Sequence, residues 1–179
     1  MPMSSPIRLA ALLLALLFSC AVQAANAKLT LEERSEIETV LAKYALALDN
    51  NDWAAYGQIF TEDAVLEFAN SSAGTNGAPL EGLKTITGFM SKQDSLKAGK
   101  SDHHTLNSVI WRDSGGVVRV WSNYLVTRAD GTVTHGEYLD QLVTTKDGWR
   151  IKHRRGNNRT QFGAQPRAWY GEFWLSGAP

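Results

Sequence analysis

The sequence predicts an α+β domain in which helices pack on one face of a curved antiparallel sheet. Two observations lead to this prediction. Apolar residues first recur at helical intervals, and from residue 103 onward they alternate with a period of two. Turn signals rich in glycine and aspartate separate the alternating runs. A chain of 179 residues is long enough for one domain with a sizeable core.

The first 24 residues have the pattern of a secretory signal peptide. Arg8 precedes an apolar run over 9–18 that is too short to span a bilayer, and small-residue cleavage sites end at Ala24 and Ala27. We therefore expect cleavage after Ala24 or Ala27 and an exported, periplasmic protein. A lipoprotein anchored through Cys20 is the alternative. Because Cys20 is the only cysteine, the mature chain would have neither a disulfide nor a thiolate.

Helices are predicted first in the mature domain, which we place over 28–160. Thr30 and Glu33 have the spacing of a capping box, so a long helix begins near Leu31 and continues to Leu48. Asp52 is a favourable N-cap for the next helix. The remaining elements before the sheet are a short helix over 53–60, a strand over 64–69, a loop over 71–79 and a third helix over 82–96.

A four-stranded meander is predicted next. Its strands cover 103–112, 117–128, 132–144 and 149–159, and tight turns over 113–116, 129–131 and 146–148 join them. Such short connections make successive strands antiparallel. The tail over 161–179 is rich in aromatic residues without a clear period, and we expect it to cover a pocket or a subunit interface.

Charge and motif content argue against several classes of function. The 18 basic and 18 acidic residues cancel and are mixed along the chain, so neither a nucleic-acid footprint nor a membrane-surface footprint is expected after signal cleavage. Phosphate-binding glycine loops and nucleophile elbows are absent from the sequence. His103 and His104 are adjacent on a strand and point to opposite faces. We therefore expect no metal site and no cofactor.

Asp49 closes the long helix, and two interpretations are open. It is either a turn residue between two helices or a carboxylate at the edge of an apolar cavity. A carboxylate at the negative end of a helix dipole is unfavourable unless a cation compensates it. A histidine would be a suitable partner, since an aspartate orients imidazole as a general base. Asp52 already caps the following helix, which favours the cavity interpretation.

Three further positions are candidates for chemistry. One of His103 and His104 should face the apolar helix, where it is either catalytic or hydrogen-bonded within the core. Tyr44 lies within the apolar stripe of the helix, where packing is the usual role of a tyrosine. Strand alternation places Arg154 on a solvated face together with Lys152.

The order of these features resembles the SnoaL-like branch of the nuclear-transport-factor-2-like superfamily. The matching segments are 44–53, 60–65, 103–107, 136–140 and 149–154, and they cover nearly the whole mature chain in the right order. The resemblance implies a cone of three helices and a strongly bent sheet around a pocket. It also implies a homo-oligomer, either a trimer or a dimer.

Within this branch the chain resembles three cofactor-free enzymes: scytalone dehydratase, the hexachlorocyclohexane dehydrochlorinase and bile-acid 7α-dehydratase. The resemblance implies that Asp49 partners a strand histidine, and it favours His103, which precedes Asn107 by four residues. It implies a catalytic position for Tyr44. It also turns Arg154 into the pocket, against the interpretation from alternation. The residues expected to line an apolar cavity are Trp53, Phe68, Tyr124 and Tyr138.

We therefore expect a cofactor-independent lyase that eliminates water, formaldehyde or halide from an apolar aromatic or polycyclic small molecule. An isomerase of the ketosteroid-isomerase type is the nearest enzymatic alternative. A non-catalytic exported protein that binds a small molecule is the alternative from another class. Catalysis requires Asp49 within hydrogen-bond reach of a histidine ring, with Tyr44 and Arg154 facing the same cavity.

Overall fold

The computed structural model describes residues 28–68, 78–93 and 101–162. Its elements are α2 (Leu31–Asp49), α3 (Trp53–Gly57), β1 (Phe60–Phe68), β2 (Leu80–Glu81), α4 (Leu83–Met90), β3 (Ser101–Arg112), β4 (Val118–Arg128), β5 (Val133–Thr145), β6 (Gly148–Asn158) and α5 (Arg159–Phe162). The expected signal peptide, most of the expected loop over 71–79 and the tail from residue 163 lie outside the described residues.

Helix α2 begins at the predicted capping box. The Thr30 side chain accepts a hydrogen bond from the Glu33 backbone N–H at 3.1 Å, and the Glu33 carboxylate accepts one from the Thr30 N–H at 2.8 Å. One face of α2 is buried through residues such as Tyr44 and Leu48. The helix ends at Asp49 because Asn51 turns the chain into the left-handed region, with φ of 53°. This turn positions Asp49 at the open end of the helix.

Helix α3 is shorter than predicted. Asp52 caps it as expected, accepting a hydrogen bond from the Ala55 N–H at 2.9 Å. The helix stops at Gly57, however, because Phe60 already belongs to β1 and the Ile59 carbonyl accepts a hydrogen bond from the Ile151 N–H of β6. Sheet pairing therefore replaces the last turn that the helical pattern indicated.

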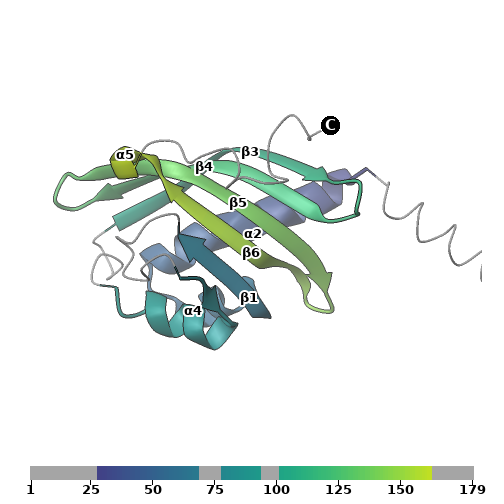
Figure 1. Ribbon diagram of the computed structural model, residues 1–179, viewed down its shortest axis with the longest axis horizontal. Helices are drawn as coiled ribbons and strands as arrows, with labels where there is room; N and C mark the ends of the chain where they lie inside the picture. Colours follow the sequence, from purple (N-terminus) through teal and green to yellow (C-terminus); the bar gives the residue numbers. More distant parts are fainter. Residues whose placement is uncertain (1–27, 69–77, 94–100, 163–179) are drawn as a thin grey trace, which may run out of the picture.

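The sheet has the order β2-β1-β6-β5-β4-β3. Strands β3 to β6 form the predicted antiparallel meander. Strand β1 pairs parallel with β6, so the sheet is mixed rather than wholly antiparallel. A parallel partner distant in sequence leaves no turn signal, which is why alternation alone missed it. Figure 1 shows the long strands of the meander side by side, with β1 and α4 at one end.

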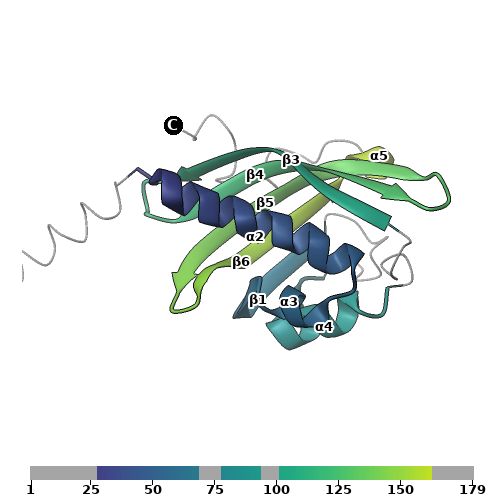
Figure 2. The same ribbon diagram turned by 180° about the vertical axis from the view of Figure 1, so that it is seen from behind.

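Helix α2 lies across one face of the sheet, as Figure 2 shows, and this face is called the inner face here. Its residues include Val120, Tyr138, Asp140 and Arg154, which register across β4, β5 and β6. Between α2 and the inner face lies an apolar core to which α3, α4 and β1 contribute. None of the described helices is long and apolar enough to cross a membrane.

A β-bulge in β6 decides which side chains reach the inner face. Leu142 pairs with Ile151 and Gln141 pairs with His153, so Lys152 is one residue too many for the β5 ladder. Both Ile151 and Arg154 are consequently buried on the inner face. The prediction that Arg154 lies on a solvated face, made from strict alternation, is therefore wrong.

Gly136 of β5 sits where there is no room for a side chain. A Cβ atom there would lie 1.9 Å from the backbone oxygen of Asn157 and 2.7 Å from ring atoms of Tyr124. Gly136→Ala is expected to lower the free energy of unfolding by roughly 1–3 kcal/mol, measured by urea denaturation. Gly88→Ala in α4 is the control, because nothing lies within 4 Å of its Cβ position. Equal stability of Gly136→Ala and wild type would contradict this tight approach.

An ionic cluster on the opposite, outer face predicts a pH effect. Glu67 contacts His153 Nε2 at 2.8 Å and accepts a hydrogen bond from Arg155 Nε at 3.2 Å. The His153 hydrogen bond, helped by the charges of His153 and Arg155, lowers the pKa of Glu67. Its contribution to stability is therefore present above the ordinary glutamate pKa and lost as pH falls through the lower folded value.

Glu67→Gln is accordingly expected to reduce the free energy of unfolding at pH 7 by about 1 kcal/mol or less, since the cluster is partly exposed. The difference from wild type should shrink and then vanish as pH falls below the ordinary glutamate pKa and the native carboxylate becomes protonated. Urea denaturation at several pH values measures it. A difference that stays constant with pH would rule out a contribution from the ionised carboxylate.

Candidate functional site

Asp49 and His103 form a hydrogen-bonded pair between α2 and β3. The Asp49 carboxylate contacts His103 Nδ1 at 2.6 Å, and it accepts hydrogen bonds from the His103 backbone N–H at 2.9 and 3.1 Å. These contacts compensate a carboxylate at the negative end of the α2 dipole. The pair is thus held by a side-chain contact and a backbone contact together.

The pair has the arrangement of an oriented general base. When Nδ1 donates its proton to Asp49, Nε2 of the neutral ring carries the lone pair that can take a proton. The side chains of His103 and Asp49 are only 11% and 13% exposed, so both are largely shielded from water. His103 therefore has the geometry expected of a base, with Asp49 as its positioning residue.

The two adjacent histidines take different faces. His103 pairs with Val126 of β4, and Tyr124, two residues along the same strand, stacks on Tyr138 of the inner face. His104 is exposed. The sequence left open which histidine turns inward, and the strand register gives His103.

A groove of about 520 Å³ lies between α2 and β3 and includes both histidines in its wall. Its lining residues are Glu38, Leu41, Ala42, Ala45, Leu46, His103, His104, Thr105, Leu106 and Ser108. Most of the α2 side of the groove is apolar. Its volume lies within the range of small-molecule sites.

Arg154 and Asp140 form a fully buried ion pair on the inner face. Arg154 Nε and Nη2 each donate a hydrogen bond of 2.7 Å to a different carboxylate oxygen of Asp140. Burial disfavours the cation, yet the Asp140 carboxylate outweighs this and raises the pKa of Arg154. The arginine therefore remains charged, and the bidentate pair fixes its orientation.

Two aromatic rings contact the guanidinium of Arg154. Its central carbon lies 3.9 Å from the ring centroid of Tyr44 and 4.2 Å from that of Tyr138. The Tyr44 ring also contacts Tyr56, with centroids 5.6 Å apart. We call Tyr44, Tyr56, Tyr138, Arg154 and Asp140 the arginine cluster. Burial raises the pKa of Tyr56 and of Tyr138, so these hydroxyls stay protonated at neutral pH.

The other three residues predicted to line an apolar cavity lie around this cluster. Trp53 contacts Tyr56 edge to face at a centroid distance of 5.7 Å, and Tyr124 stacks on Tyr138 at 4.7 Å. Phe68 lies over Gly156, where a Cβ atom would come within 3.1 Å of its ring. Trp53, Phe68 and Tyr124 are all partly buried. These three partly buried rings lie around the buried arginine cluster, and we call them the aromatic margin.

Three buried polar atoms near this margin have no hydrogen-bond partner within the described part of the chain. They are Tyr56 Oη, Arg154 Nη1 and Ser122 Oγ. Ser122 is paired with Tyr138 across β4 and β5, on the inner face. A buried polar group without a partner is costly, and a ligand atom is one way to satisfy it.

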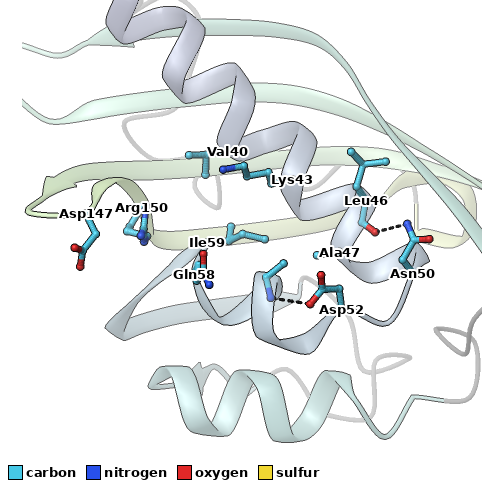
Figure 3. Close-up of a pocket in the computed structure, with 11 residues that line it drawn as sticks. Val40, Lys43, Leu46, Ala47, Asn50, Asp52, Gln58, Ile59, Asp147 and Arg150 are labelled. Carbon is cyan, nitrogen blue, oxygen red and sulfur yellow. Dashed lines mark hydrogen bonds between the residues drawn. The ribbon is translucent and has the colours of Figure 1, made fainter.

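The predicted site residues thus fall into two groups. Asp49 joins His103, while Tyr44 and Tyr138 join Arg154. Of the cavities formed by the described residues, neither the His103 groove nor a second cavity of about 410 Å³ includes the arginine cluster. Figure 3 shows this second cavity, lined by Asp52, Arg150 and other residues of α2, α3 and β6. The inner face, through Tyr124, connects the two groups.

Sequence reasoning missed Tyr56, Asp140 and Ser122. Asp140 carried a usable signal, because it stands two residues after Tyr138 and therefore on the same face. Tyr56 lies in a helix too short for a periodic pattern. Ser122 carried a similar signal, because it stands two residues before Tyr124 on β4 and therefore on the same face. Across the described ranges 28–68, 78–93 and 101–162, no three His, Cys, Asp or Glu side chains gather into a metal site.

Residues 29–155 match the family model of the SnoaL-like domain. The chain belongs to the SnoaL-like family. The match covers α2, α3, α4, all of the sheet except the last three residues of β6, the Asp49–His103 pair and the arginine cluster. The predicted resemblance is thereby confirmed at the level of the family and its fold.

Solved structures agree with this assignment. An NTF2-like protein with a cystatin-like fold from Novosphingobium aromaticivorans is 21% identical, with a TM-score of 0.61 over 88% of this chain and 92% of that one. A scytalone-dehydratase-like protein from the same organism is 21% identical, with a TM-score of 0.59 over 72% and 85%. Rv3472(D26N) from Mycobacterium tuberculosis, described as of unknown function, is 27% identical, with a TM-score of 0.59 over 70% and 71%. A search of curated proteins finds no match.

Proposed function

We propose that this SnoaL-like protein is a cofactor-independent lyase that eliminates water, formaldehyde or halide from an apolar aromatic or polycyclic molecule. The observation that supports this most is the Asp49–His103 pair, with 2.6 Å between the carboxylate and Nδ1. An oriented, largely buried imidazole is suited to removing a proton at neutral pH. The family contains enzymes of this kind, which supports the same conclusion.

The first step is proton removal by His103 Nε2 from carbon or from a hydroxyl group. When a C–H bond breaks, its electron pair forms the new double bond and the leaving group departs with its own bonding pair. The imidazolium then returns the proton to a departing hydroxide, giving water. In the formaldehyde case, the hydroxymethyl O–H gives its proton to His103 and the C–C bond breaks, so that formaldehyde leaves and the electron pair stays on the remaining carbon. That carbon then takes the proton back from the imidazolium.

Asp49 and the arginine cluster have separate tasks in this proposal. Asp49 fixes the ring tautomer of His103 and stabilises the imidazolium that forms. Arg154 and Tyr44 stabilise negative charge that develops on a substrate oxygen, and the buried surroundings strengthen this effect. Trp53, Phe68, Tyr124 and Tyr138 hold the ring of the substrate by apolar contact.

A product-resolved screen tests the proposal. The full-length protein is incubated with aromatic diols, steroids and halogenated rings, and released formaldehyde, halide and loss of water are measured. We expect one of these eliminations and no requirement for added metal or cofactor. Double-bond migration without loss of a group would identify an isomerase instead. Binding without turnover of any class would identify a binding protein.

The cellular location and the oligomeric state of the protein are also proposals. Export to the periplasm, by cleavage after Ala24 or Ala27, follows from the sequence pattern of the first residues. We further propose a homo-oligomer, as in related members of the superfamily. Mass determination of the mature protein tests cleavage, and light scattering tests the subunit number.

A further inference from the structure

We propose that the second cavity, which lies between α2, α3 and the first residues of β6, binds a small apolar molecule that carries one carboxylate. Figure 3 shows this cavity, which has a volume of about 410 Å³. Of the described residues, Leu46 alone lines both this cavity and the His103 groove. The second cavity is thus a separate ligand site, and its ligand is independent of the proposed lyase activity.

The base of the second cavity is apolar. Val40 and Ala47 of α2 and Ile59, which follows α3, line it and are buried. Leu46 at its edge is 61% exposed, so this apolar surface is in contact with water. A ring that packs on these side chains would remove that surface from water, which favours binding. The volume of the cavity lies within the range of small-molecule sites.

Two cations line the same cavity. Lys43 extends from α2 and Arg150 from β6. Arg150 Nη1 donates a hydrogen bond of 2.8 Å to the Trp149 carbonyl of its own strand. Within residues 28–68, 78–93 and 101–162, neither cation lies within ion-pair distance of a carboxylate. In the view of Figure 3, both side chains lie toward the same end of the cavity, which makes that end attractive to an anion.

The two carboxylates in the wall of the cavity already have partners. Asp52 caps α3 by accepting the hydrogen bond from the Ala55 N–H, and the positive end of the helix dipole balances part of its charge. Asp147 pairs with Lys146 at 3.3 Å. In the view of Figure 3, Asp52 lies toward the end of the cavity away from Arg150. The carboxylates therefore do not occupy the place that the two cations offer to a ligand.

A single carboxylate matches this arrangement of charge. Its two oxygens can accept hydrogen bonds from the planar guanidinium of Arg150 and from the ammonium of Lys43. A group with two negative charges would bring its second charge near Asp52, which would repel it. The apolar base holds the rest of the ligand. The second cavity is accordingly suited to a small aromatic acid rather than to a phosphate ester.

The ligands 2-naphthoate and 2-naphthamide test the charge preference. They share the ring system and closely resemble each other in shape, but only the first is charged. Isothermal titration at about 0.15 M salt is expected to show about tenfold tighter binding of naphthoate, and about 1 M salt should remove most of this preference. Equal binding of the amide, or no binding of naphthoate up to about 10 mM, would overturn the proposal.

Chemical shifts of the backbone amides locate the bound acid. We expect the largest changes on addition of naphthoate at the second cavity, for example at Lys43, Ala47 and Ile59, and small changes over 103–108 of β3. The opposite distribution would place the acid in the His103 groove and would contradict the proposed site.

Lys43→Gln and Arg150→Gln each remove one cation and keep a polar side chain. Each is expected to lower naphthoate affinity by about three- to tenfold and to leave naphthamide affinity unchanged. Neither side chain is fully buried, and urea denaturation checks that each variant is folded. Unchanged naphthoate affinity in both folded variants would rule out the site.

Lys84→Gln is the matched control. Lys84 is an exposed lysine of α4, and it lines neither the second cavity nor the His103 groove. We expect naphthoate affinity within about twofold of wild type. A loss as large as that of Lys43→Gln would show that the net charge of the protein, and not the second cavity, determines the preference.

Discussion

His103→Ala is expected to lower kcat by roughly 10²- to 10⁴-fold, because it removes the proposed general base. Asp49→Asn should also lower kcat, since an amide keeps the shape of the side chain but cannot stabilise the imidazolium that forms. Rates are measured on the substrate that the elimination screen identifies. Urea denaturation of both variants shows whether the fold is kept.

His104→Ala provides the matched control for this experiment. The two histidines are neighbours on β3, yet only His103 contacts Asp49. We expect His104→Ala to retain kcat within a few-fold of wild type, although His104 lines the same groove. Undiminished turnover in both His103→Ala and Asp49→Asn would disprove the proposed mechanism.

Asp140→Ala is expected to lower the free energy of unfolding by about 3–5 kcal/mol, because it leaves Arg154 as a buried charge without its carboxylate. The expected loss is large relative to the stability of a typical domain. Chemical denaturation at pH 7 measures it. The double variant Asp140→Leu with Arg154→Met should recover much of this loss, since both charges are then absent.

Asp147→Ala is the control for loss of a carboxylate. Asp147 also pairs with a cation, Lys146, but the two side chains are 61% and 90% exposed. The change should therefore alter stability by less than about 1 kcal/mol. If Asp140→Ala also lowered the free energy of unfolding by less than about 1 kcal/mol, the buried pair would contribute no more to stability than a surface ion pair does.

Much of the fold was predictable because local signals agreed with one another. The capping box at Thr30, the Asp52 cap and the turn signals between strands each describe a few adjacent residues, and each was found in the structure. Two kinds of information were missing. The parallel pairing of β1 with β6 joins segments about 90 residues apart, as the pair Leu66 and Arg154 shows. The end of α3 depends on that same pairing.

The sequence predicted most residues of the candidate site, but it predicted less well which of these residues contact one another. Periodicity and helix electrostatics identified Asp49 and a histidine of β3, and the structure joins Asp49 to His103. Arg154 required the family resemblance, because alternation alone placed it on the solvated face. The Asp140 pairing depends on strand register and on a bulge, neither of which has a local sequence signature.

The bulge at Lys152 has a consequence for how this strand tolerates changes of length. In a regular strand, deletion of one residue turns every following side chain to the opposite face. In β6, deletion of Lys152 would restore a regular ladder with β5, and Ile151 and Arg154 would both still face inward. An insertion of one residue at the same point would, in a regular ladder, keep Arg154 facing inward but move it from opposite Asp140 to opposite Tyr138. Relatives with one residue fewer here can therefore keep the buried pair of Arg154 and Asp140, whereas those with one residue more need a second change to keep it.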